Sequence, residues 1–257
     1  MWETPLSENL QKEIVSAYER LCRPIPTNPI ELLGYKISFM GEAHLRWLFG
    51  EIFMDASYFF HTDNDRPLIF DCGSNIGMSV LFFKKLYRNA RIIAFEPDPA
   101  TFATLRQNVV QNRLSDVELH SVAIGGHSGQ IELFRDPSPE SSSLKMSTLR
   151  QRHDGPGVVV PSRRLSEFIR SDIDLLKLDV EGAEDAVMDE LADSGKLRYV
   201  RRLHLEYHHH IDATADKLSS MLRLIESNGF GYQLRSIAKP WPSEAVFQDI
   251  SIYCYRK

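Results

Sequence analysis

The chain has 257 residues, of which 43% are hydrophobic and 25% are charged, and its formal net charge is −5. These values are typical of a folded protein with one domain, or one domain and an appendage, and they exclude a disordered or fibrous chain. The negative charge gives no general reason to bind nucleic acid, and the chain shows neither a signal-peptide profile nor a run of about 20 apolar residues that could span a membrane.

The first 62 residues are predicted to form a helical cap outside the main domain, which takes residues 63–257. Apolar residues at helical spacing indicate a helix over residues 8–21, and three prolines between residues 24 and 29 end it. A second apolar region, residues 44–60, is rich in aromatic side chains and is interpreted as the rest of the cap. These aromatic residues either fill a core or form the wall of a substrate pocket.

From Pro67 onward, short apolar runs alternate with segments of helical periodicity, which predicts an α/β fold with a mostly parallel sheet and helices on both faces. The predicted strands are residues 68–71, 91–95, 117–124, 129–134, 175–180 and 200–207. The predicted helices are residues 78–87, 100–111, 165–169, 184–191 and 213–227.

Two features depart from this alternation. Residues 232–237 and 250–255 are predicted strands with no helix between them, so they form an antiparallel C-terminal hairpin. Residues 136–161 are rich in Ser, Pro and Gly and are predicted to be a long lid or binding loop. Basic residues in and beside this loop form either a solvated surface or a site for an anionic acceptor: Lys145, Arg150, Arg152, Arg163 and Arg164.

A glycine-containing turn joins the first strand of the main domain to the helix that follows. Gly73 and Gly77 have the spacing Gly-x-x-x-Gly, which differs from the glycine patterns of dinucleotide sites and phosphate loops. Glycine allows a sharp turn and the close approach of a ligand, and the amides at the helix start favour an electron-rich group. Asp71, just before the turn, would oppose a pyrophosphate, so the pattern favours a nucleoside without phosphates. Glu96, at the end of the second strand, can accept hydrogen bonds from both ribose hydroxyls.

Three motifs together resemble the FkbM family of S-adenosylmethionine-dependent methyltransferases. They are Asp71-Cys72-Gly73-Ser74-Asn75-Ile76-Gly77, Phe95-Glu96-Pro97 and Leu176-Lys177-Leu178-Asp179-Val180-Glu181-Gly182-Ala183-Glu184. The resemblance covers about residues 67–210. It implies the Rossmann-like class I methyltransferase fold, with a seven-stranded sheet, and O-methylation of a hydroxyl on a carbohydrate or natural-product-type small molecule. The cofactor-binding residues that it implies are Asp71, Gly73, Ser74, Asn75, Gly77, Glu96, Pro97, Ser121, Val122, Ala123 and Asp179.

Acidic and imidazole side chains at two strand ends are the candidate catalytic residues. Strand alternation places Lys177, Asp179 and Glu181 on one side, and likewise groups His204, Glu206 and His208. If the two strands are neighbours, Asp179, Glu181, Glu206 and His208 converge beside the methyl donor. An alcohol needs its proton withdrawn, so this group either contains a general base such as His208 or holds a divalent metal, and we favour the base without a metal. A structural alternative is that Lys177 and Glu184 form a buried ion pair.

Two other classes of function are left open by the sequence: a silent nucleoside-binding scaffold of the same fold, and a nicotinamide-dependent oxidoreductase. The expected partner is a small-molecule or saccharide acceptor, without nucleic acid or a membrane span, and a homo-oligomer is left open. Three cysteines without metal-type spacing, Cys22, Cys72 and Cys254, predict reduced thiols in a cytoplasmic protein.

Overall fold

The computed structural model describes residues 6–135, 146–147, 157–211, 216–236 and 248–257. The predictions for residues 212–215, for the end of the hairpin strand at residue 237 and for most of the long loop lie outside the described residues. Within the described residues no helix is long and apolar enough to cross a membrane. All three cysteines are free thiols, as predicted.

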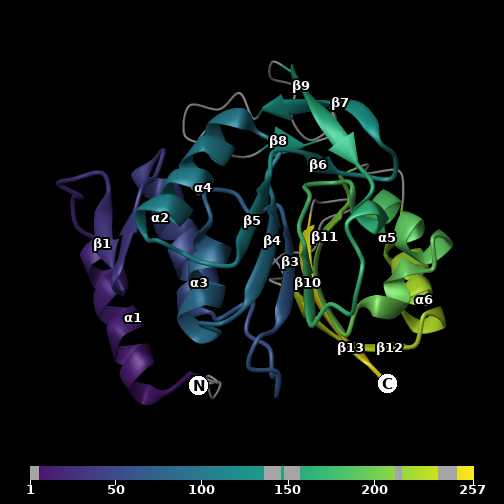
Figure 1. Ribbon diagram of the computed structural model, residues 1–257, viewed down its shortest axis with the longest axis horizontal. Coiled ribbons are helices and arrows are strands. Elements are labelled where there is room, and N and C mark those ends of the chain that lie inside the picture. The colour runs from purple at the N-terminus through teal and green to yellow at the C-terminus, as the bar shows by residue number, and fades with distance from the viewer. Residues whose placement is uncertain (1–5, 136–145, 148–156, 212–215, 237–247) are drawn as a thin grey trace.

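A seven-stranded sheet forms the centre of the molecule (Figure 1), with the strand order β12-β13-β11-β10-β3-β4-β5. β13 pairs antiparallel with both of its neighbours, and the other pairs in the sheet are parallel. The predicted fold class is therefore confirmed, including the antiparallel C-terminal hairpin. The strands are β3 (Leu68–Cys72), β4 (Arg91–Phe95), β5 (Val117–His120), β10 (Leu175–Leu178), β11 (Arg202–His209), β12 (Phe230–Ser236) and β13 (Gln248–Arg256).

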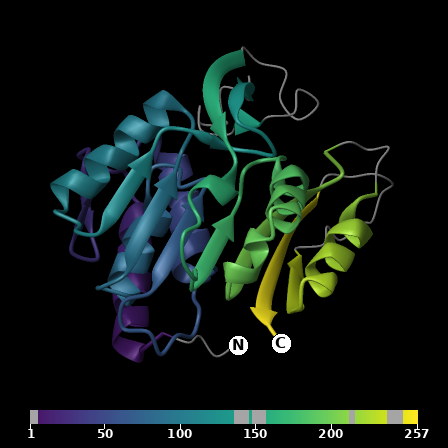
Figure 2. The ribbon, with the colours of Figure 1, turned by 45° about the vertical axis from the view of Figure 1, so that its right-hand side comes forward.

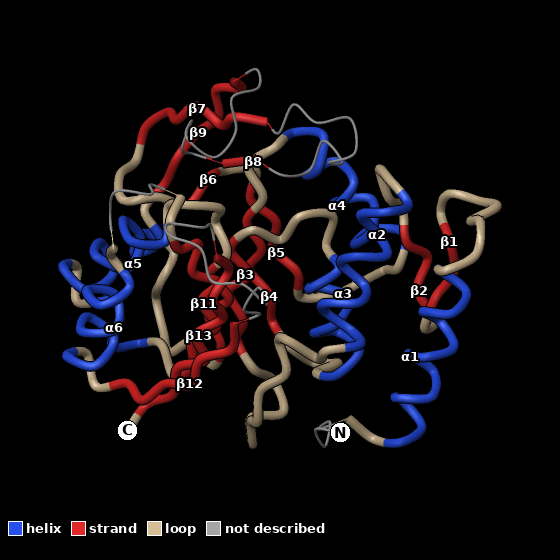
Figure 3. The backbone as a smooth tube through the Cα atoms, turned by 180° about the vertical axis from the view of Figure 1, so that it is seen from behind, coloured by secondary structure: helices blue, strands red, loops and turns tan. Residues whose placement is uncertain are grey.

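Alternate residues of the central strands pack into two different hydrophobic cores. Ile69 and Ile92 face the core that contains the N-terminal aromatic residues, whereas Phe70 and Ile93 face the opposite core. Helices cover both faces, as Figures 2 and 3 show. On the first side lie α3 (Met78–Leu86) and α4 (Pro99–Gln111), and on the second α5 (Glu184–Asp193) and α6 (Leu218–Ser227). Short 3₁₀ turns, η2 (Leu165–Glu167) and η3 (Lys196–Tyr199), complete the second side.

The N-terminal region is less helical than predicted. It contains α1 (Glu8–Leu21), the hairpin β1 (Ile30–Leu32) and β2 (Tyr35–Ile37), α2 (Glu42–Phe49) and a π-helical turn, η1 (Gly50–Met54). The hairpin was missed because its two-residue turn is Leu33-Gly34 rather than a typical Asn-Gly, although both residues have positive φ. Phe49, Phe53, Tyr58 and Phe60 belong to the first core, which they share with the central sheet, whereas Trp47 is exposed. The domain boundary between residues 62 and 63 stays a prediction.

A second sheet of four strands, in the order β6-β9-β7-β8, lies beyond the end of β5 (Figure 1). Two predictions need correction here. The expected strand over residues 117–124 is two strands in different sheets, and the last part of the expected long loop is strand β9, which pairs antiparallel with β7. The elements are β6 (Ala123–Ile124), β7 (Gly129–Arg135), β8 (Met146–Ser147) and β9 (Gly157–Arg163).

Candidate active site

The turn after β3 is built from residues with left-handed backbone conformations. Gly73, Asn75 and Gly77 have φ values of 82°, 51° and 89°. The backbone N–H groups of Gly73 and Ser74 both donate to the carbonyl of Phe95, at 3.0 Å, which ties the turn to the end of β4. A Cβ atom on Gly73 would lie 1.8 Å from the carbonyl oxygen of Asp179, so the turn also packs directly on the end of β10. Only glycine fits at this position.

Several predicted cofactor-binding residues support this turn through hydrogen bonds within the fold. The buried Asp71 accepts a hydrogen bond from Ser79 Oγ at 2.6 Å, and Ser74 Oγ donates to the Asp71 carbonyl at 2.8 Å. Gly77 precedes the first residue of α3. Asp71, Ser74 and Gly77 are not among the residues that line the pocket described next, and their role in cofactor binding stays a prediction. Ser121 is not among the lining residues either.

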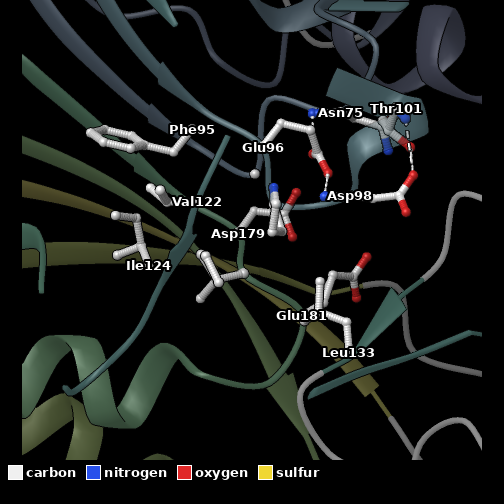
Figure 4. A pocket seen from close by; sticks show the side chains of 14 residues that line it. Asn75, Phe95, Glu96, Asp98, Thr101, Val122, Ile124, Leu133, Asp179 and Glu181 are labelled. Carbon is white, nitrogen blue, oxygen red and sulfur yellow. Dashed lines mark hydrogen bonds between the residues drawn. The ribbon is translucent and has the colours of Figure 1, made fainter. Parts of the chain in front are cut away.

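A pocket at the carboxyl ends of β3, β4 and β10, here called the Glu96 pocket, contains the other predicted cofactor residues (Figure 4). From the prediction it includes Gly73, Asn75, Glu96, Pro97, Val122, Ala123 and Asp179. Its remaining walls were not predicted to bind the cofactor, although Glu181 was predicted to be catalytic; they are Phe95, Asp98, Thr101, Ile124, Leu133, Val180 and Glu181. Leu133 comes from the second sheet. The apolar pattern of its strand did not indicate that this sheet would reach the pocket.

Glu96 is a buried carboxylate held by the backbone. Its Oε2 accepts from Asn75 N and its Oε1 from Asp98 N, both at 2.9 Å (Figure 4). Burial raises the pKa of Glu96 to about 8, against the lowering effect of these hydrogen bonds. Each oxygen keeps a second lone pair for a ligand hydroxyl, so this carboxylate is suited to a polar, uncharged donor.

Next to this pocket, a row of polar residues crosses the first face of the sheet. Asp71, Lys177, His204 and Tyr253 are register partners on adjacent strands. Lys177 Nζ lies 3.5 Å from Asp71 Oδ1 and 3.2 Å from Asp179 Oδ2. Burial would lower the pKa of Lys177, but the two carboxylates outweigh it and raise that pKa. The suggested Lys177–Glu184 pair is wrong, because Lys177 is engaged on this face while Glu184 reaches a different partner.

That partner is His208, whose buried imidazole lies among five carboxylates. They belong to Asp179, Glu181, Glu184, Glu206 and Asp249, the last with its Oδ1 3.8 Å from His208 Nε2. His208 Nδ1 is 2.9 Å from Glu184 Oε1, and its Nε2 is 3.2 Å from Glu181 Oε2. The same Nε2 is 3.9 Å from both Asp179 Oδ1 and Glu206 Oε1. The structure thus brings together all four predicted catalytic residues, here called the His208 cluster (Asp179, Glu181, Glu206 and His208).

The route by which they meet differs from simple strand alternation. β10 ends at Leu178, and Glu181 has a positive φ of 57° in the loop that follows.

Burial would lower the pKa of His208, but Glu184 and Glu181 raise it well above its usual value. A protonated imidazole donates a proton and does not accept one, so the electrostatics do not favour His208 itself as the base. Burial and the neighbouring Asp179 raise the pKa of Glu206 well above its usual value, which makes it a stronger base once ionised.

A second, narrower pocket, here called the Glu206 pocket, joins the cluster to the N-terminal region. It is lined by Glu51, Ser57, Tyr58, Lys177, Asp179, His204, Leu205, Glu206, Ser251, Ile252 and Tyr253. Burial and the nearby Asp179 raise the pKa of Glu51 to about 7. The Tyr58 ring lies over Lys177, with Nζ 5.3 Å from the ring centre. Asp179 lines both pockets and is their common wall.

Comparison with known proteins identifies the family. The family model of the methyltransferase FkbM domain matches residues 71–232 of this chain. The chain belongs to this family. The FkbM resemblance found in the motifs is therefore confirmed, and the protein is a methyltransferase rather than a nicotinamide-dependent oxidoreductase.

Individual relatives agree with this assignment. Methyltransferase 1 of Beauveria bassiana is 34% identical over 172 residues, which cover 59% of this chain and 69% of that protein. The 31-O-demethyl-FK506 methyltransferase FkbM of Streptomyces tacrolimicus is 27% identical over 74% of this chain and 84% of its own length. The crystal structure of methyltransferase FkbM from Methylobacillus flagellatus has a TM-score of 0.50 and 15% identity, and the match covers 94% of this chain but 58% of that one. This last likeness supports the fold alone.

Proposed function

We propose that this FkbM-family methyltransferase transfers a methyl group from S-adenosylmethionine to a hydroxyl of a carbohydrate or natural-product-type small molecule. The observation that carries the proposal is the shared wall at Asp179, where the Glu96 pocket meets a buried group of carboxylates. The Streptomyces relative is named a 31-O-demethyl-FK506 methyltransferase, and this name supports an oxygen acceptor.

The residues of the Glu96 pocket fit S-adenosylmethionine. Glu96 offers a carboxylate to the ribose hydroxyls, and the apolar side chains of Val122, Ile124 and Leu133 offer a surface for the adenine. No basic side chain lines this pocket in the described part of the chain, as expected for a nucleoside ligand without phosphates. Among the predicted cofactor residues, we retain Gly73, Asn75, Glu96, Pro97, Val122, Ala123 and Asp179 as direct contacts.

The chain's own contribution to the reaction is alignment and proton removal. When bound, S-adenosylmethionine supplies an electrophilic methyl group on a sulfonium leaving group. Asp179 and Glu206 orient the acceptor hydroxyl toward that methyl carbon, and they take up the proton of the hydroxyl. With the donor bound, the deprotonated oxygen would be positioned to accept the methyl group, and the cluster would pass the proton to solvent.

We infer that the acceptor enters the Glu206 pocket. Carboxylates, two serine hydroxyls and two tyrosine rings line it, and these groups suit an acceptor rich in hydroxyls. Glu51, Ser57 and Tyr58 come from the first 62 residues, so in this proposal the N-terminal cap helps to select the acceptor. Residues 63–257 form the domain that binds the methyl donor.

A direct test is to incubate the full chain with S-adenosylmethionine and pairs of acceptors, each a glycoside and its analogue with one hydroxyl replaced by hydrogen. We expect S-adenosylhomocysteine to form with hydroxylated acceptors, and NMR of the product to show one new O-methyl group. Deoxygenation at that position should abolish turnover. Methylation of an amine analogue with no reaction at any hydroxyl would contradict O-methylation. Absence of S-adenosylhomocysteine binding by calorimetry would contradict the cofactor itself.

A further inference from the structure

We propose that Asp179, Glu206 and His208 bind one divalent cation of the Mg²⁺ and Mn²⁺ class. One potential ligand atom from each residue lies within 4.8 Å of the other two. The three side chains come from the ends of the adjacent parallel strands β10 and β11, so the sheet itself brings them together. The binding of the ion is independent of the proposed function, whereas its chemical consequence rests on it.

Asp179 presents an oxygen without a hydrogen-bonding partner. Its Oδ2 accepts from Lys177 Nζ at 3.2 Å, but its Oδ1 is inaccessible to solvent and accepts no hydrogen bond from any described residue. A buried carboxylate oxygen left in this state carries an uncompensated desolvation cost. A cation bound to Oδ1 removes that cost, which a purely structural ion pair with Lys177 does not.

His208 is oriented as metal-ligating histidines are. Its Nδ1 faces Glu184 Oε1 at 2.9 Å, and the same Glu184 oxygen accepts from the backbone N–H groups of Val180 and Gly182 at 3.1 and 3.0 Å. This arrangement fixes the ring, with Nε2 3.9 Å from oxygens of both Asp179 and Glu206 and 3.8 Å from Asp249 Oδ1. A carboxylate behind the distal nitrogen is the usual outer partner of a metal-bound imidazole. Glu181 Oε2 lies 3.2 Å from Nε2, so binding of the ion would displace that contact and the proton on this nitrogen.

The spacing and the type of the ligand atoms indicate the ion. Atoms bound to one ion at about 2.1 Å lie roughly 3–4 Å apart, so the 3.9 Å separations around His208 Nε2 need only small side-chain rotations. Two carboxylates and one imidazole suit Mn²⁺ and leave positions for water and a substrate oxygen. Because Asp179 is the common wall of both pockets, the ion would contact the acceptor hydroxyl and lower its pKa.

A second group of possible ligands serves as the matched control. His209, His210 and Asp216 also lie within 4.8 Å of one another. Here, however, the Asp216 side chain is 86% exposed and already contacts His210 Nε2 at 2.6 Å. We therefore expect no bound ion in this group.

The test is titration of the full chain with Mn²⁺, without methyl donor or acceptor, followed by the electron paramagnetic resonance signal of unbound Mn²⁺ and by calorimetry. We expect one Mn²⁺ per chain, displaced by excess Mg²⁺. Glu206→Gln should weaken binding by about tenfold or more, and Asp216→Asn should leave it within about twofold. Thermal unfolding verifies that each variant is folded, and Asp179→Asn replaces Glu206→Gln if the latter is not.

Three results would overturn the site: no binding up to roughly 1 mM Mn²⁺, unchanged binding in folded Glu206→Gln, or loss of binding in Asp216→Asn. Since no methyl transfer is measured, such a result leaves the proposed O-methyltransferase intact. Conversely, an enzyme that binds Mn²⁺ but methylates no hydroxyl would contradict the proposed function alone.

Discussion

The Glu96 pocket and the Glu206 pocket share Asp179 but differ in how their buried carboxylates are stabilised. In the first, both oxygens of Glu96 accept backbone N–H groups that the turn and β4 hold in place. In the second, burial raises the pKa values of Glu51, Asp179 and Glu206, and the charge of Asp179 adds to the rise for the other two. One region is preorganised for a neutral ligand, and the other holds negative charge that a proton or a cation must balance. In the proposed function, this difference separates the site that binds the donor from the site where methyl transfer occurs.

The largest expected effect is in the Glu206 pocket. Glu206→Gln removes a proton acceptor and potential ligand while keeping the side-chain volume, so kcat should fall by about 10²–10⁴-fold. The affinity for S-adenosylhomocysteine should stay within about twofold, because Glu206 does not line the Glu96 pocket. Steady-state kinetics measures kcat, and calorimetry measures the affinity for S-adenosylhomocysteine. A comparable loss of cofactor affinity would show that the two pockets are not functionally separate.

The reciprocal change is Glu96→Ala. Leaving two ribose hydroxyls without their charged acceptor should cost about 1–3 kcal/mol of S-adenosylhomocysteine binding, a loss of about 5-fold to 150-fold in affinity. At saturating cofactor, kcat should change much less than in Glu206→Gln. Calorimetric titration of both variants gives the comparison. Unchanged affinity in a folded Glu96→Ala variant would exclude Glu96 from ribose recognition.

The raised pKa of Glu96, about 8 in the protein without ligand, gives the Glu96 pocket its own pH dependence. Ribose hydroxyls donate to the ionised carboxylate, so binding should favour loss of the proton. Affinity for S-adenosylhomocysteine is therefore expected to rise by about tenfold from pH 7 to pH 9 and then to level off. Calorimetry in buffers of different ionisation enthalpy should detect the released proton. Glu96→Gln should remove both effects, and an affinity that falls with pH would contradict the assignment.

The two regions also differ in how far the sequence could predict them. The Glu96 pocket is built from short segments in which a strand, a turn and a helix start follow one another, so Gly73, Asn75 and Glu96 could be read locally. The mostly parallel sheet and the terminal hairpin could be predicted from the alternation of elements, whereas the order of the strands could not. The contact of Asp71 with Lys177 could not be predicted, because it depends on the register of β3 with β10.

The Glu206 pocket depends on contacts between distant parts of the chain. Glu51 and Tyr58 lie in an apolar segment whose packing on β10 and β11 leaves no local pattern. Leu133 reaches the Glu96 pocket only because β7 belongs to a separate sheet. The four members of the His208 cluster were identified through strand ends, but the orientation of the imidazole required Glu184, whose partner no spacing rule indicated.

The smallest expected effect tests whether the N-terminal region belongs to the acceptor side. Tyr58→Leu removes a ring that lies over Lys177, and a buried contact of this type contributes about 1 kcal/mol. The KM for the acceptor should rise roughly fivefold, with the KM for S-adenosylmethionine unchanged. Tyr58→Phe keeps the ring and should stay close to wild type in both constants. Thermal unfolding of both variants separates this effect from loss of packing around the buried side chain. If Tyr58→Leu raised the KM for S-adenosylmethionine instead, the N-terminal region would act through the Glu96 pocket, and the division between the two sides would fail at this residue.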